Sequence, residues 1–210
     1  SLFMAMIALA GLVGAKLWHC LENPALLFAH LMIVFQPGGL AFFGGLLAGA
    51  VMLVYLAHVH RIPVLQMMDI ASPPTAIGYA IARLGCLTSG DGDYGIPTRL
   101  PWGMTFPNGL VPTNEYVHPT PIYESIVALA IFYYLWRLRR RALDGAIPDG
   151  QVFAVYLILS GIARFLVEFI RINPRVLFGM SNAQVASLVS VLFGFFLYLA
   201  ERRVGNSIAR

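Results

Sequence analysis

Residues 160–171 read Ser-Gly-Ile-Ala-Arg-Phe-Leu-Val-Glu-Phe-Ile-Arg and close an apolar run that begins near residue 151. Arg164, Glu168 and Arg171 follow one another at i, i+4 and i+7, so a helix would carry all three on one face. Each charge inside a membrane helix costs roughly 2.5–3.5 kcal/mol on insertion scales. The stretch therefore predicts a helix face turned toward protein or a water-filled cavity. The face is either a ladder of ion pairs between helices or an anion site in which Glu168 orients two guanidiniums.

The composition of the whole chain indicates a membrane protein. Of 210 residues, 59% are apolar and 11% are charged, and the mean hydropathy is +0.75. A soluble domain has about 45–50% apolar and about 25% charged residues, so the balance excludes that class, a disordered chain and a disulfide-stapled secreted module. The spacing of Cys20 and Cys86 predicts neither a disulfide nor a metal site.

Hydropathy predicts an all-α polytopic membrane protein in which residues 1–210 form a single transmembrane domain. We expect about six transmembrane helices, because six segments approach the length that a ~30 Å hydrocarbon core requires: about 2–20, 38–58, 64–86, 121–137, 151–171 and 183–200. Ala25–Phe35 is too short to span and is predicted to be re-entrant or interfacial. Ser1 opens an apolar run without a signal-peptide pattern, so we expect a further helix upstream.

The arginines predict the orientation. The net charge is +4, and thirteen of the fourteen basic residues are arginine. If the helices alternate in direction, two arginine-bearing loops and the C-terminal end lie on the same side of the membrane. The positive-inside rule makes this side cytoplasmic. Its arginines are Arg61, Arg137, Arg139, Arg140, Arg141, Arg202, Arg203 and Arg210. The opposite side then carries a proline-rich loop at about 88–120, a small exterior head. The basic balance favours the lipid bilayer and an anionic lipid as partners, and not nucleic acid.

A second cluster follows the predicted helix 64–86. Arg83 stands near its exterior end, and residues 88–95 read Thr-Ser-Gly-Asp-Gly-Asp-Tyr-Gly. Glycine lets backbone N–H groups approach a ligand closely, so Asp91, Asp93 and Gly95 are candidate residues for binding a polar headgroup. The alternatives are that Arg83 only snorkels to the interface and that the Gly-Asp string forms plain turns.

A third cluster, His-Pro-Thr-Pro-Ile-Tyr-Glu at residues 118–124, enters the predicted helix 121–137. Histidine is the residue type suited to act as a base near neutral pH, so His118 is a candidate base at the membrane boundary, although a single interfacial histidine is commonly incidental. Glu124 lies in the first turn, where it either matches the helix dipole or binds substrate together with Tyr123. Upstream, the paired glycines of residues 38–45, Gly-Gly-Leu-Ala-Phe-Phe-Gly-Gly, predict close helix packing.

Taken in order, these clusters resemble the bacterial prolipoprotein diacylglyceryl transferase family. Residues 38–45 resemble its GG-x-S-F-H-GG segment, and residues 82–95 resemble its G-R-x-G-N-F-x-N-G-E…G signature with Arg83 at the arginine. Residues 118–124 are similar to its HPxQLYE motif. Residues 164–171 resemble its R-x-x-x-E-F-x-R motif, and Gln184 falls at the family's last-helix MGQ.

The resemblance implies a multi-pass enzyme of the bacterial cytoplasmic (inner) membrane that needs no cofactor. Such enzymes transfer the diacylglyceryl group of phosphatidylglycerol to the lipobox cysteine in the signal peptide of a preprolipoprotein, and glycerol-1-phosphate is released. Arg83 and Arg164 would neutralise charge that develops on the phosphate, with Arg171 and Glu168 contributing to binding.

The chain departs from the family pattern at three places. Phe43 stands where the family has its glycine-flanked histidine, and Cys86 stands at its asparagine. The family's glutamate has no exact counterpart, and Asp91 and Asp93 are the candidates to replace it. Either His118 replaces the missing base, or the thiolate forms without one, or the acceptor differs. The alternative function is a phospholipid-binding relative with another acceptor or without catalysis.

Overall fold

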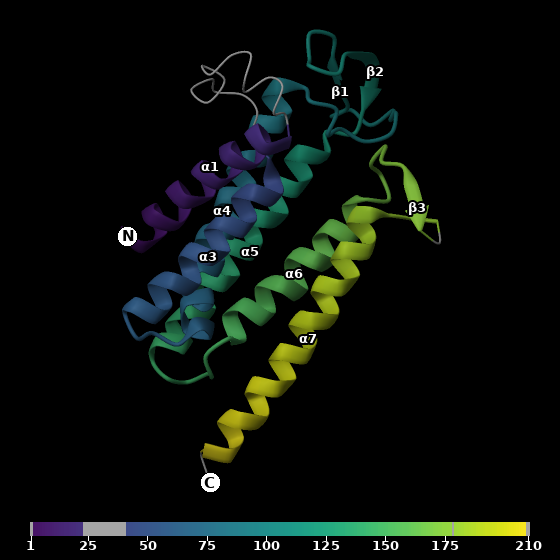
Figure 1. Cartoon of the computed structure of the whole chain (residues 1–210). Helices are drawn as coiled ribbons and strands as arrows, with labels where there is room; N and C mark the ends of the chain where they lie inside the picture. Colours follow the sequence, from purple (N-terminus) through teal and green to yellow (C-terminus); the bar gives the residue numbers. More distant parts are fainter. Residues whose placement is uncertain (1, 23–40, 178, 209–210) are drawn as a thin grey trace. The chain divides into compact units, whose positions relative to one another are not determined.

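The computed structural model describes residues 2–22, 41–177 and 179–208 (Figure 1). Most of them lie in helices: α1 (Leu2–Glu22), α3 (Phe42–Val59), α4 (Val64–Ser89), α5 (Thr120–Leu143), α6 (Gln151–Val167) and α7 (Asn182–Ile208). Each of the six apolar segments predicted from hydropathy overlaps one of these helices. The predicted re-entrant segment Ala25–Phe35 lies outside the described residues.

The expectation of an all-α chain is wrong in detail, because two short antiparallel hairpins interrupt the helices. Strand β1 (Met104–Phe106) pairs with β2 (Thr113–Val117), and β3 (Arg175–Leu177) pairs with β4 (Met180–Ser181). The first hairpin belongs to the segment predicted as an exterior head. The second joins α6 to α7.

Residues 1–68 and 69–210 form two compact units. In the first unit, glycines let α1 and α3 touch. A Cβ on Gly44 would collide with Trp18 and with the carbonyl oxygen of Gly14, and the N–H of Ala41 donates to the carbonyl of Ala15 at 3.0 Å. The close helix packing predicted from the paired glycines is confirmed for Gly44 and Gly45.

In the second unit, α6 packs against both α5 and α7, and α4, α5 and α6 supply a core of Ala76, Ile131, Leu135 and Val152. Two glycines bring α6 and α7 together, because a Cβ on Gly161 would come within 2.9 Å of the Ser187 carbonyl and one on Gly194 within 2.8 Å of the Ala154 carbonyl. The Asp69 carboxylate of α4 accepts the N–H groups of Gly150 and Phe153 at 2.8 and 2.7 Å. It thereby satisfies donors at the start of α6 that the helix itself leaves free.

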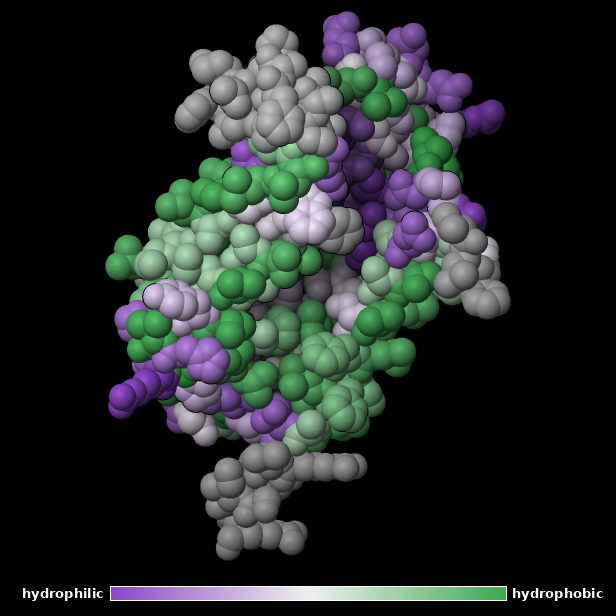
Figure 2. Space-filling view, in the orientation of Figure 1, coloured by the Kyte–Doolittle hydropathy of each residue, from purple (hydrophilic) through white to green (hydrophobic). Residues whose placement is uncertain are grey.

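Apolar side chains cover the exposed sides of the helices. Leu192, Phe193 and Phe196 of α7 are exposed, and Figure 2 shows hydrophobic colour over the helices and hydrophilic colour around the β1–β2 hairpin. Leu2–Glu22 and Asn182–Glu201 are long and apolar enough to cross a membrane, while Gly44–Val59 and Gln151–Val167 are shorter apolar helices. Such surfaces are typical of helices solvated by lipid.

Helix α6 ends earlier than predicted. Its last residue is Val167, Glu168 is its C-cap, and Arg171 lies in an extended segment that pairs with Gly95 in an antiparallel bridge. The helix therefore does not carry all three charged residues on one face. It orients Arg164 and Glu168, while the turn that follows brings Arg171 back toward them.

We predict that Gly44→Ala destabilises the protein although alanine favours a helix. The new Cβ forces α1 and α3 apart, and overpacking of this kind costs about 1–3 kcal/mol. Gly49→Ala in the same helix is the matched control, because its Cβ would meet Ile7 at an ordinary 3.8–3.9 Å. The midpoint of thermal unfolding in detergent should fall for Gly44→Ala and stay or rise for Gly49→Ala, and equal midpoints would refute the close packing.

Candidate functional site

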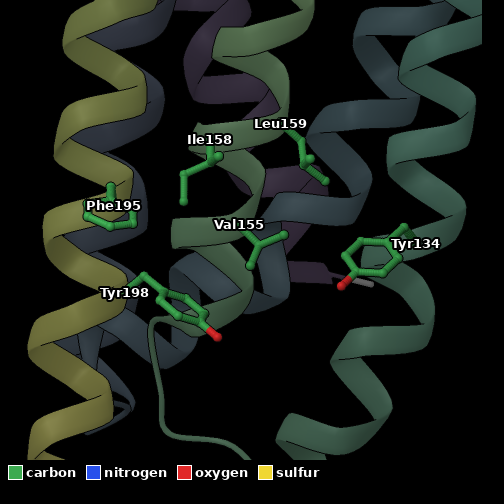
Figure 3. Close-up of a pocket in the computed structure, with 6 residues that line it drawn as sticks. All are labelled: Tyr134, Val155, Ile158, Leu159, Phe195 and Tyr198. Carbon is green, nitrogen blue, oxygen red and sulfur yellow. The ribbon is translucent and has the colours of Figure 1, made fainter.

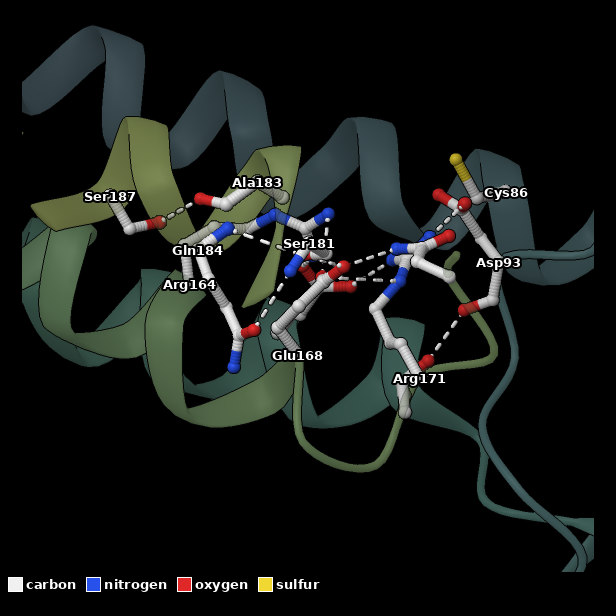
Figure 4. A network of polar contacts seen from close by, with 12 residues as sticks. Cys86, Asp93, Arg164, Glu168, Arg171, Ser181, Ala183, Gln184 and Ser187 are labelled. Carbon is white, nitrogen blue, oxygen red and sulfur yellow. Dashed lines mark hydrogen bonds and ion pairs between the residues drawn. The ribbon is translucent and has the colours of Figure 1, made fainter. Parts of the chain in front are cut away.

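Six charged side chains meet in the second unit, at the end of α5 and α6 that adjoins the hairpins. We call them the arginine–carboxylate network: Arg83, Asp93, Glu124, Arg164, Glu168 and Arg171. Figure 4 shows the part of it around Asp93, Arg164, Glu168 and Arg171. Two predicted clusters and the charged end of α6, far apart in sequence, thus form one site.

Glu124, on α5, links side chains from three other segments: α4, α6 and the segment that follows α6. Its side chain is 4% exposed and accepts hydrogen bonds from Tyr79 Oη at 2.6 Å, Arg164 Nη1 at 3.2 Å and Arg171 Nη1 at 3.1 Å. Arg83 Nη1 lies 3.9 Å from the same carboxylate. Glu124 is therefore the buried counter-ion of three guanidiniums and accepts hydrogen bonds from two of them. Because α5 begins at Thr120, Glu124 does not lie in its first turn, where a match to the helix dipole was expected.

Glu168 is the most buried carboxylate of the network, with 1% of its side chain exposed. Its carboxylate lies 3.0 Å from Arg164 Nη2 and accepts hydrogen bonds from Ser181 Oγ at 2.7 Å and Asn173 Nδ2 at 2.6 Å. Glu124 and Glu168 together hold both terminal nitrogens of Arg164. A guanidinium held at two nitrogens keeps a fixed orientation.

The start of α7 supports Glu168 through a capping box. The N–H of Gln184 donates to Ser181 Oγ at 3.2 Å, and the N–H of Ser181 donates to Gln184 Oε1 at 3.0 Å. This reciprocal pair satisfies two N–H groups at the helix end and leaves the hydroxyl proton of Ser181 for Glu168. Ser181 and Asn173 were not predicted as site residues, although the sequence Ser-Asn-Ala-Gln at 181–184 carries the capping-box signature.

Asp93 closes the network from the loop that follows α4. Its carboxylate is bonded to both Arg83 and Arg171. Gly90 and Gly92, which precede Asp93 in the loop, have φ values of 56° and 91°, which glycine adopts without strain, and Asp91 accepts the N–H of Asp93 at 3.1 Å. Partial burial acts to raise the pKa of Asp93, but the charges of Arg171 and Arg83 outweigh it and hold that pKa below its usual value.

Gly95 joins this loop to the rest of the site. Its N–H donates to the His118 carbonyl at 2.8 Å, and the N–H of Ile96 donates to the Ile170 carbonyl at 2.8 Å. Residues 95–97 thus lie between residues 170–171 and 117–118. A Cβ on Gly95 would come within 2.9 Å of His118 Cβ, so the predicted ligand-facing glycine is one at which three backbone segments meet.

His118 and Tyr123 form a separate group beside the network. Tyr123 Oη lies 3.3 Å from His118 Nδ1 and accepts the indole N–H of Trp102 at 2.7 Å. Trp102 comes from the loop before β1 and was not predicted as a site residue. No sequence signal marks it, because the pairing joins residues 21 positions apart.

Two further features are a possible metal donor set beside the network and an apolar pocket away from it. Cys86 Sγ and carboxylate oxygens of Asp91 and Asp93 lie within 4.8 Å of one another, a donor set that could hold a metal ion, but Asp93 is already bonded to two guanidiniums. Toward the other end of the helices, an apolar pocket of about 490 Å³ is lined from α5, α6 and α7 (Figure 3): Tyr134, Val155, Ile158, Leu159, Phe195 and Tyr198. Tyr134 is ten residues beyond Glu124, about 15 Å along α5.

Comparison with known proteins identifies the family. Residues 1–200 match the family model described as prolipoprotein diacylglyceryl transferase. The chain belongs to this family. Similar proteins named phosphatidylglycerol–prolipoprotein diacylglyceryl transferase occur in Clostridium tetani (33% identity, 95% of this chain, 80% of the relative), Leptospira interrogans (32%, 79% and 60%) and Tropheryma whipplei (30%, 87% and 70%).

The comparisons confirm the family and the enzyme class predicted from the ordered motifs, because the curated relatives are named as transferases. The chain spans 60–80% of the length of these three relatives. The side chain of Phe43, which stands where the family has its histidine, lies outside the described residues.

We predict that Glu124→Gln lowers the free energy of unfolding by about 3 kcal/mol, because it leaves buried guanidiniums without their shared counter-charge. Glu115→Gln on the exposed strand β2 is the matched control and should leave stability unchanged. Thermal unfolding in detergent compares the two variants. Equal stability of Glu124→Gln and Glu115→Gln would mean that the network carries no energetic weight.

We predict that Asp93 contributes stability that acid removes. Its folded-state pKa lies below the unfolded value of about 3.9, so its contribution is fully present above about pH 5 and disappears as pH falls through the folded-state pKa. Between about pH 6 and pH 3, the thermal midpoint should fall further in the wild type than in Asp93→Asn. Asp144→Asn, at the exposed C-cap of α5, should retain the wild-type fall, and an unchanged fall in Asp93→Asn would contradict this assignment.

Proposed function

We propose that the protein transfers the diacylglyceryl group of phosphatidylglycerol to the lipobox cysteine thiol in the signal peptide of a preprolipoprotein and releases glycerol-1-phosphate. The observation that carries the proposal is the convergence of three guanidiniums on the buried Glu124 carboxylate in a chain of this family. Arginine suits phosphate because its planar fork presents several N–H donors at a fixed charge.

The charges of the network suggest how a phosphate enters. Three arginines and three carboxylates give a formal sum of zero, so an incoming phosphodiester has to take guanidinium donors from a carboxylate. Asp93 is the suitable one. Its side chain is 28% exposed, against 4% for Glu124 and 1% for Glu168, and it sits on a glycine-bearing loop. We propose that the phosphate replaces Asp93 on Arg83 and Arg171, while Arg164 stays fixed by both glutamates.

The proposed reaction needs stabilisation of negative charge on the phosphate. The thiolate sulfur forms a bond to the terminal glycerol carbon of the diacylglyceryl group, and the bond from that carbon to the phosphate oxygen breaks with its electron pair going to oxygen. The thiol proton leaves to a base or to water, and the phosphate charge changes from −1 to −2. Guanidiniums already aligned by buried carboxylates stabilise such a change without reorganising.

The proposal includes the membrane in which the protein lies and its orientation there. The helices cross the bacterial cytoplasmic membrane, with the arginine-rich end of α5 on the cytoplasmic side and the loop 88–120 outside. The network then lies near the exterior interface, where a phospholipid headgroup resides. The apolar surfaces of α6 and α7 support this placement.

A second candidate function is phospholipid binding without transfer to a cysteine. Phe43 favours it, because the family's glycine-flanked histidine is missing at that position. The two candidates share the arginine–carboxylate network and differ only in turnover.

We predict that the purified protein, in vesicles containing phosphatidylglycerol, adds a diacylglyceryl group to a lipobox peptide. Mass spectrometry should detect the modified peptide and an equal amount of glycerol phosphate. Arg83→Ala and Arg164→Ala should each reduce the rate by about 10²–10³-fold. Arg140→Ala, at the exposed end of α5, is the matched control. It removes the same positive charge outside the site and should react like the wild type.

Bound phosphatidylglycerol without a modified peptide, under conditions in which a family member from another organism reacts, would establish the binding function instead. Wild-type rates for Arg83→Ala and Arg164→Ala would reduce the network to structural ion pairs.

A further inference from the structure

Trp102, Tyr123 and His118 form a chain of hydrogen bonds whose direction the chemistry of the groups determines. The indole nitrogen of Trp102 can only donate, and it donates to Tyr123 Oη at 2.7 Å. Tyr123 Oη lies 3.3 Å from Nδ1 of His118. Trp102 is 55% exposed, yet the one polar atom of its ring donates to the tyrosine.

The hydroxyl proton of Tyr123 needs an acceptor. Within the described part of the chain, His118 Nδ1 is the one acceptor within hydrogen-bond distance of this hydroxyl. If Nδ1 carried a proton, Trp102 and His118 would both donate to Oη, and the tyrosine proton would have no partner among these residues. If Nδ1 carries no proton, the Trp102 N–H and the Tyr123 O–H each have an acceptor in this chain of hydrogen bonds.

We infer that neutral His118 is held with Nδ1 accepting from Tyr123 and its proton on Nε2, so that it offers the substrate a donor and not a base. Trp102 and Tyr123 are positioning residues for this tautomer. The hydrogen bonds from Trp102 to Tyr123 and from Tyr123 to His118 thus make His118 an N–H donor, whereas the sequence analysis expected a base.

The backbone places this donor beside the arginines. Residues 95–97 lie between residues 117–118 and 170–171, so the backbones of His118 and Arg171 are two strand spacings apart, about 10 Å. A side chain from each can therefore reach one headgroup. Resting on the proposed transferase function, the inference assigns His118 Nε2–H to an oxygen of the phosphate or of the glycerol bound there.

Nitrogen NMR of the full-length protein, labelled with ¹⁵N-histidine and reconstituted in nanodiscs, tests the tautomer without any activity. The chain has five histidines, and the signal lost in His118→Gln assigns His118. At a pH where the ring is neutral, we expect Nε2 protonated and Nδ1 bare. Protonated Nδ1 with bare Nε2 would overturn the inference.

Two substitutions test the chain. Tyr123→Phe removes the donor to Nδ1, and Trp102→Phe lets the tyrosine accept from Nδ1, so each should shift His118 toward a mixture of tautomers. Tyr116→Phe and Trp136→Phe, both on exposed side chains, are matched controls and should leave the tautomer unchanged. If Tyr123→Phe and Trp102→Phe alter stability but not the tautomer, their role is only structural.

Activity separates a donor from a base. The amide nitrogen of glutamine can take the place of Nε2–H, so His118→Gln should retain much of the activity, whereas His118→Leu should lose about 100-fold, as for removal of one oxyanion donor. Equal losses in both variants would support a base and contradict the donor. If the wild type shows no transfer at all, the proposed function fails while the NMR result still decides the tautomer.

Discussion

A carboxylate buried among guanidiniums is the constraint on which the second unit depends. Glu124 and Glu168 are almost fully enclosed, and a buried charge is tolerated only when opposite charges and hydrogen bonds surround it. Arg164 and Arg171 meet this requirement from α6 and its following turn, and Tyr79 and Arg83 meet it from α4. The packing of these helices and the geometry of the site thus have the same origin.

The supporting interactions extend this constraint into the loops. The capping box of α7 aims Ser181 at Glu168, and the backbone of residues 95–97 fastens the Asp93 loop to the segment that carries Arg171. In the proposed reaction, a guanidinium held by such contacts would need little rearrangement when charge develops on a substrate. The part of the site best suited to move is the loop around Asp93, where two positive-φ glycines precede the most exposed carboxylate of the network.

Much of this arrangement could be predicted from the sequence, because charges inside apolar helices are costly and therefore informative. Arg83, Glu124 and Arg164 were all expected at a site, and the i, i+4 spacing correctly paired Arg164 with Glu168. The end of α6 could not be predicted, since helical periodicity continues to residue 171 while the pairing of Arg171 with Gly95 is set by a distant segment. The partnership of Trp102 with Tyr123 was missed for the same reason: it exists only after the loop has folded.

The attachment of Asp93 to the network by a short loop has a consequence for turnover in the proposed reaction. In that reaction, a phosphate monoester with charge −2 would bind the same guanidiniums more tightly than the phosphodiester from which it is formed, so the leaving group would tend to remain in the site. A carboxylate attached by a short loop competes at an effective concentration of about millimolar or more. Asp93 would then displace the product from Arg83 and Arg171 by competing for the same guanidiniums. Its return would restore the neutral site for the next lipid.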